Sequence, residues 1–113
     1  NLREDFSVPH VALKLWHPGA DDGVSEATRV FASSLAHPHC GPLAMADTAT
    51  FFGEAAPLLK SYAYVALRGA DSFGLLALAS EDAQRFYPEM GTLYLTRIGE
   101  IISACLRRQL EPA

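Results

Sequence analysis

Two histidines and a cysteine lie close together in the sequence, in the segment His37-Pro38-His39-Cys40. Imidazole and thiolate groups are common ligands of zinc and of other soft divalent metals. Pro38 restricts the backbone between the two imidazoles, and no second pair of ligands follows at zinc-finger spacing. A closed site would need a further ligand from elsewhere in the fold. We therefore expect no metal, and His37, His39 and Cys40 are the candidate ligands if one binds.

The thiol of Cys40 is also the candidate for covalent chemistry. A catalytic thiol needs a depressed pKa and usually a resolving partner. The other cysteine, Cys105, falls on the apolar side of a predicted helix, where a core or interface role is the simpler interpretation. The sequence contains no Ser-His-Asp order, no phosphate-binding glycine loop and no pair of carboxylates placed by one element. We expect no catalytic residue and no cofactor.

Aromatic side chains could line a pocket for a small molecule, because such pockets combine apolar walls with a few polar groups. The same residues could equally be ordinary core residues of strands and a short helix. The candidate ligand-binding residues are His10, Trp16, Phe51, Phe52, Tyr62 and Tyr64.

The elements that must position these residues centre on a predicted hairpin. The apolar runs Tyr62 to Arg68 and Phe73 to Ser80 are separated by Gly69-Ala70-Asp71-Ser72, whose residues favour tight turns. Both faces of the two strands are mainly apolar, so both faces of the sheet should be covered.

From about Met90 the apolar period changes from two to about 3.6, which predicts a long amphipathic helix reaching Leu110. Gly99 lies in the middle of this helix, where glycine costs about 1 kcal/mol relative to alanine. A close packing contact would compensate for that cost. The wide apolar side also suggests pairing of two chains, with the candidate interface residues Tyr94, Leu95, Ile98, Ile102 and Cys105.

The first half of the chain should supply the other layers. Alternation predicts a strand over Val8 to Trp16, with Val11, Leu13 and Leu15 on one face. Helical spacing predicts a helix over Val24 to Leu35, capped by Asp22 or Ser25. The prolines make the segment His37 to Pro42 irregular. A helix over Thr48 to Ala56 follows, with Asp47 as its cap and an interruption near Gly53.

Length and composition indicate one globular domain over residues 1–113, of the α+β class. The net charge of −4 argues against a nucleic-acid partner. No apolar run is long enough to span a bilayer, and two cysteines are too few for a disulfide framework. We expect a cytoplasmic protein without membrane contact. Because the chain opens at Asn1 inside polar amphipathic sequence, we also expect it to be a fragment of a longer protein.

Residues Phe73 to Leu110 resemble the end of a GAF domain, with a strand that begins near a glycine and a long closing helix. The whole chain resembles, more closely, the bacterial family known as domain of unknown function 484. The matching features are the strand Val8 to Trp16, Cys40-Gly41-Pro42-Leu43, Val65-Ala66-Leu67, Arg85-Phe86, Met90-Gly91-Thr92 and Ile98-Gly99-Glu100.

The resemblance implies a GAF/PAS-like antiparallel sheet of about five or six strands flanked by helices, with a long C-terminal helix. It also implies a preceding helical segment that this chain mostly lacks. GAF domains as a class bind small ligands and often pair through their terminal helices. The expected function is therefore a noncatalytic regulatory or sensor module that binds a small ligand or a protein partner and forms a homodimer. The alternatives are a scaffolding module without a ligand and a thiol-dependent enzyme similar to a methionine sulfoxide reductase.

Overall fold

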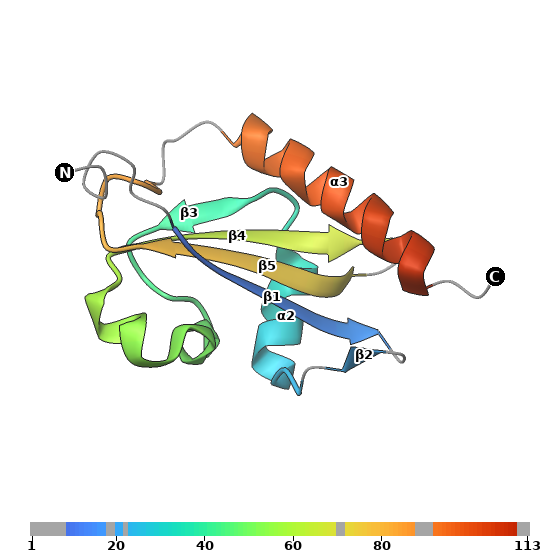
Figure 1. Ribbon diagram of the computed structural model, residues 1–113, viewed down its shortest axis with the longest axis horizontal. Coiled ribbons are helices and arrows are strands. Elements are labelled where there is room, and N and C mark those ends of the chain that lie inside the picture. Colours follow the sequence, from blue (N-terminus) through green and yellow to red (C-terminus); the bar gives the residue numbers. More distant parts are fainter. Residues whose placement is uncertain (1–8, 18–19, 22, 70–71, 88–91, 111–113) are drawn as a thin grey trace.

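The computed structural model describes residues 9–17, 20–21, 23–69, 72–87 and 92–110. Its strands and helices are mixed along the chain (Figure 1). In order they are β1 (His10–His17), β2 (Ala20–Asp21), α2 (Glu26–Ser34), β3 (His39–Gly41), the 3-10 helix η1 (Thr48–Leu58), β4 (Ser61–Arg68), β5 (Ser72–Ser80) and α3 (Leu93–Leu110).

The predicted pairing of the two hairpin strands is confirmed, while Ala70 and Asp71 of the predicted turn lie outside the described residues. β4 and β5 pair antiparallel from Ser61↔Ser80 to Leu67↔Gly74. Side chains on both faces of β4 are buried, including Tyr64 and Val65. Both faces of this sheet are therefore covered, as the doubly apolar pattern predicted.

The described strands form one antiparallel sheet in the order β2-β1-β5-β4-β3. Four of these strands have three or more residues, and the two-residue β2 extends the sheet beyond β1. The domain is thus α+β, with a four-stranded sheet plus one very short edge strand where about five or six strands were expected. β3 lies at the opposite edge and pairs with only Tyr62, Ala63 and Tyr64 of β4.

Helices cover the two faces of the sheet (Figure 1). α3 lies on one face, where Leu95 packs with Val65, Leu67 and Leu76. α2 and η1 lie on the other face, where Ala32 packs with Tyr62 and Tyr64. The domain therefore has three layers with an apolar core on each side of the sheet.

Two predictions for the first half of the chain are confirmed and one is wrong. β1 (His10–His17) covers most of the predicted strand Val8 to Trp16, whose first residue lies outside the described residues. α2 (Glu26–Ser34) lies within the predicted helix Val24 to Leu35, with Ser25 as its cap. The segment His37 to Pro42 is not wholly irregular, because β3 forms inside it. A proline disfavours helical geometry in the residue before it and favours extended geometry there, so Pro42 suits Gly41 to the end of an edge strand.

Gly99 has the close contact that its position predicted, although the neighbour is a strand. A Cβ atom at Gly99 would overlap Cγ1 of Val65 on β4. Only glycine lets the α3 backbone lie this near the sheet. The cost of a glycine in mid-helix is therefore offset by helix-to-sheet packing.

Arg68 ties both helical layers to the end of β4. Its guanidinium donates to the carbonyl oxygens of Ala32, Ser33 and Leu35, at 3.3, 3.0 and 2.6 Å. α2 has no basic residue in its own last turn, so this cation satisfies its orphan carbonyls and complements its dipole. The backbone N–H of Arg68 donates to Oγ of Ser103 on α3, at 3.1 Å.

A buried hydroxyl network fixes the start of η1. Thr48 Oγ1 donates to the Met45 carbonyl at 2.7 Å and lies 2.6 Å from Tyr64 Oη. The Met45 N–H donates to the same Oη at 3.1 Å. Because the one hydroxyl proton of Thr48 is used, Tyr64 donates to Thr48 and accepts from Met45.

Removing the Tyr64 hydroxyl should therefore destabilise the domain. We expect Tyr64→Phe to lower the free energy of unfolding by about 1–2 kcal/mol, since it leaves the Met45 N–H without its acceptor and removes the hydrogen bond that Thr48 accepts. Urea denaturation measures this loss. Tyr62→Phe is the matched control, because the neighbouring ring stacks on Tyr64 at 6.2 Å but its hydroxyl makes none of the described hydrogen bonds. Equal losses in the two variants would contradict the network.

Candidate functional site

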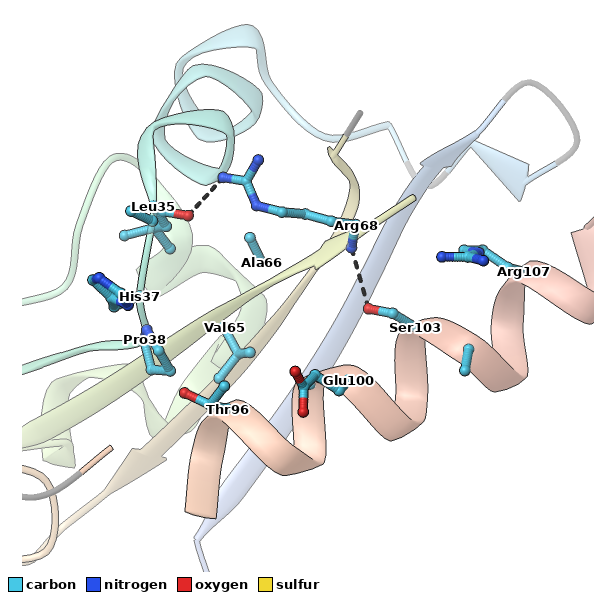
Figure 2. Close-up of a pocket in the computed structure, with 13 residues that line it drawn as sticks. Leu35, His37, Pro38, Val65, Ala66, Arg68, Thr96, Glu100, Ser103 and Arg107 are labelled. Carbon is cyan, nitrogen blue, oxygen red and sulfur yellow. Dashed lines mark hydrogen bonds between the residues drawn. The ribbon is translucent and has the colours of Figure 1, made fainter. Parts of the chain in front are cut away.

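A cleft of about 400 Å³ opens between α3 and the connection from α2 to β3, beside the end of β4 (Figure 2). Its volume lies within the range of small-molecule sites in proteins. The α2–β3 connection, β4 and α3 contribute its lining, which comprises Leu35, Ala36, His37, Pro38, Val65, Ala66, Arg68, Thr96, Gly99, Glu100, Ser103, Ala104 and Arg107.

The cleft exists because β3 is short. The ladder between β3 and β4 stops at His39↔Tyr64, so no strand of the described part of the chain pairs with the second half of β4 on that side. Arg68 holds the end of α2 at one end of the gap through its bond to the Leu35 carbonyl. Gly99 keeps α3 close over β4 and gives the cleft its second wall.

The charged side chains of the cleft differ in whether they already bind other groups of the protein. The Arg68 guanidinium is occupied by the carbonyls at the end of α2. Glu100 and Arg107 extend from α3 toward β4 in Figure 2, and among the described residues neither side chain forms a hydrogen bond or ion pair. Ser103 accepts from the Arg68 N–H and keeps its own proton to donate.

The six residues predicted to bind a ligand do not line this cleft. Tyr62 and Tyr64 are buried in the core under α2 and η1, and Phe52 lies 6.4 Å from the ring of Tyr62. Trp16 donates from Nε1 to the Ser72 carbonyl at 3.2 Å.

Two of the six lie against charged groups instead. His10 lies 3.6 Å from the carboxylate of Glu81. Phe51 packs under the ammonium of Lys14, at 5.3 Å. Five of the six candidates pack in or against the core beneath α2 and η1, namely Trp16, Phe51, Phe52, Tyr62 and Tyr64.

The His37-Pro38-His39-Cys40 segment does not bring its three candidate ligands together. Alternation along β3 separates its residues, since the His39 ring stacks on Tyr64 while Cys40 packs in the core beneath α3. His37 lines the cleft. Within the ranges that the structure describes, no group of three or more His, Cys, Asp or Glu residues could hold a metal ion.

The two cysteines are both free thiols with different surroundings. Burial raises the pKa of the Cys40 thiol, which lowers its thiolate fraction near neutral pH. Cys105 is exposed on α3.

The five residues predicted to form a dimer interface divide between core and surface. Leu95 is buried, and Ile98 and Ile102 pack partly against the sheet. Tyr94 is 75% exposed, and Cys105 is exposed. Sequence reasoning did not select Ile101, which is 64% exposed.

A second exposed apolar group lies on β1. Val11 and Leu13 are 61% and 41% exposed, although they share the face of the sheet that α3 covers elsewhere. On α3, the flank with Glu100 and Arg107 faces the cleft at the β3 edge. At 100° per residue, Ile98 and Cys105 occupy the flank toward β1. We call Val11, Leu13, Tyr94, Ile101 and Cys105 together the α3–β1 apolar surface.

Asp47 does not cap η1 with its side chain, contrary to the sequence-based expectation. Its carboxylate accepts from Oγ of Ser25 at 2.8 Å and from Oγ1 of Thr28, and so it ties the start of η1 to the start of α2. The hydrogen bond from Thr28, and then that from Ser25, lower the pKa of Asp47 below its ordinary value of 3.8.

The domain should therefore lose a stabilising contribution in acid. A lowered pKa in the folded state stabilises the protein above the pKa of the unfolded chain, and this is lost as the pH falls through the lower folded-state pKa. We expect Asp47→Asn to lower the urea midpoint most near neutral pH. The difference from the unmodified protein should shrink as the pH falls below about 4. A difference that stays constant down to pH 2.5 would contradict this role of the carboxylate.

The fold and the cleft together define an α+β domain with one antiparallel sheet between helical layers and a polar-rimmed cleft beside its last helix. A family model for proteins of unknown function, DUF484, matches residues 1–111. The chain belongs to this family. No curated protein matches the chain. Among the described residues, no helix is both long and apolar enough to cross a membrane.

Proposed function

We propose that this chain is a noncatalytic, GAF-like regulatory module that binds a second copy of itself through the α3–β1 apolar surface. The observation that carries the proposal is the exposure of Val11, Leu13, Tyr94 and Ile101, which are 61%, 41%, 75% and 64% exposed. Contiguous apolar patches larger than a few hundred Å² are rare on monomers and mark interaction sites.

The dimensions of the sheet support a helical partner at this surface. Strands lie about 4.8 Å apart and a helix is about 10 Å wide, so one helix covers about two strands. α3 covers β4 and reaches β5, and this leaves β1 with room for one more helix. The exposed side chains supply apolar area on the order of 500 Å², a large part of the ~800 Å² per partner of a stable interface. The outer flank of α3 from a second copy supplies a matching apolar surface.

The state of the thiols supports a noncatalytic role over a methionine sulfoxide reductase-like enzyme. Cys40 is buried and its pKa is raised, so it is a poor nucleophile. Cys105 belongs to the apolar surface. Two free thiols also suit a reducing compartment, and we place the domain in the cytoplasm.

Static light scattering over a range of protein concentrations tests the pairing. We expect the apparent mass to approach twice the 12.2 kDa of one chain as concentration rises. A mass that stays at one chain up to millimolar protein would remove the homodimer and favour a different protein partner for the surface.

Binding of a small ligand is the second candidate function, and the cleft of about 400 Å³ beside α3 favours it. Ligands that bind the folded state raise the melting temperature, and the rise grows with the logarithm of ligand concentration above the dissociation constant. A thermal-shift screen of metabolites and cyclic nucleotides tests this function. Hits should lose their effect when Ala104, which lines the cleft, is replaced by a bulkier residue such as phenylalanine.

A further inference from the structure

We propose that the cleft binds a free α-amino acid with an apolar side chain, recognised as a zwitterion. This inference rests on the small-ligand function proposed above and names its chemical class. Three features of the cleft carry it: an open strand edge, a pair of opposite charges, and an apolar wall.

The open edge is that of β4 at Ala66. Alternate residues of an antiparallel strand direct their N–H and C=O groups to the same side. The Arg68 N–H points away from β5, because it donates to Ser103. Ala66, two residues earlier, faces the same side and lines the cleft beyond the last β3 pair at His39↔Tyr64. The backbone N–H of Ala66 can donate a hydrogen bond to a ligand in the cleft, and its C=O can accept one.

The opposite charges are Glu100 and Arg107. Both are on the cleft flank of α3, where Figure 2 shows them extending toward β4. Seven residues separate them, which is about 10 Å along a helix and within the combined reach of the two side chains toward one ligand. Among the described residues they have no ion-pair partner, so both charges remain available.

An amino acid zwitterion can pair with four groups at once, which are the two charged side chains of α3 and the N–H and C=O groups of Ala66. Its carboxylate accepts from the Arg107 guanidinium and the Ala66 N–H. Its ammonium donates to the Glu100 carboxylate and the Ala66 C=O. The apolar wall of Leu35, Pro38 and Val65 then receives the side chain. A simple anion would leave the Glu100 charge facing it, and an uncharged apolar molecule would leave both charges without partners.

Isothermal titration calorimetry with matched probes tests the proposal. L-Leucine supplies both charges, 4-methylpentanoate lacks the ammonium, and isoamylamine lacks the carboxylate. We expect L-leucine to bind and each deletion analogue to bind roughly tenfold to a hundredfold more weakly, because each loses a charge-assisted contact. Equal binding of L-leucine and either analogue would overturn the recognition of a zwitterion.

Two variants and one control assign the contacts. Arg107→Gln should weaken L-leucine about tenfold or more while leaving isoamylamine unchanged. Glu100→Gln should weaken L-leucine similarly while leaving 4-methylpentanoate unchanged or slightly tighter. Arg108→Gln removes a neighbouring exposed cation outside the cleft and should leave L-leucine binding within about twofold.

The outcomes separate this inference from the broader function. If L-leucine and L-phenylalanine both fail to bind while another metabolite binds in a way that Ala104→Phe blocks, the ligand class is wrong and the small-ligand function stands. If no tested compound binds at the cleft, both fall. Loss of L-leucine binding in Arg108→Gln as large as in Arg107→Gln would also overturn the assignment.

Discussion

Replacing Gly99 with valine is expected to lower the free energy of unfolding by about 1–3 kcal/mol, because it forces side-chain atoms into a filled space. Even a Cβ atom at this position overlaps Cγ1 of Val65. Valine has few alternative rotamers, so Val65 cannot turn aside cheaply. The gain in helix propensity over glycine is only a few tenths of a kcal/mol and does not offset the clash. Urea denaturation followed by circular dichroism measures the loss.

A double-mutant cycle tests the cause of this loss. Val65→Ala makes room beneath α3, so Gly99→Val should cost much less in the Val65→Ala background than in the unmodified protein. Ala104→Val places the same side chain at an exposed position of the same helix and should change stability by no more than about 0.5 kcal/mol. If the costs of Gly99→Val and Val65→Ala simply add, the two residues are not coupled and the close contact is not what requires glycine.

The sequence predicted the hairpin and the helices because each rests on a local pattern. The short apolar runs of β4 and β5 identified two strands covered on both faces, and the 3.6-residue period of α3 identified that helix and its inward face. The mid-helix glycine also predicted a close contact correctly. What the pattern could not supply was the neighbour, since Val65 and Gly99 come together only through the fold.

The cleft could not be predicted because it depends on where a strand ends. β3 stops at three residues, and local propensity does not fix that length. Arg68 closes one end of the cleft by binding carbonyls more than 30 residues earlier in the chain. Most of the aromatic residues predicted to line a pocket pack on the opposite face of the sheet, because large side chains near an apolar sheet serve equally well as core.

The face of β1 that carries Val11 and Leu13 shows a further limit of prediction from the sequence. Alternation placed Val11, Leu13 and Leu15 on one face, which is correct, but it could not say how much of this face is covered. Leu15 packs against the core beneath α3, whereas Val11 and Leu13 remain exposed in the single chain. Apolar side chains of this kind that stay exposed in the single chain are expected where two chains form an interface.

Replacing Ile101 with glutamate should therefore weaken self-association about a hundredfold or more, because pairing would bury an unpartnered charge from each copy. Ile101 is 64% exposed in the single chain, so its replacement should leave the melting temperature of the dilute protein nearly unchanged. Ile98 and Ile102 could not make this distinction, because both pack partly against the core. Sedimentation equilibrium measures the dissociation constant.

Leu93→Glu is the matched control, because Leu93 is 71% exposed on the same helix but lies in line with Thr96 and Glu100 on the cleft flank. It should leave the dissociation constant within a few-fold of the original value. A dimer that survives Ile101→Glu but is lost with Leu93→Glu would place the interface over the cleft. That result would leave the apolar surface of β1 for a different partner, since two chains paired across the cleft flank would not cover Val11 and Leu13.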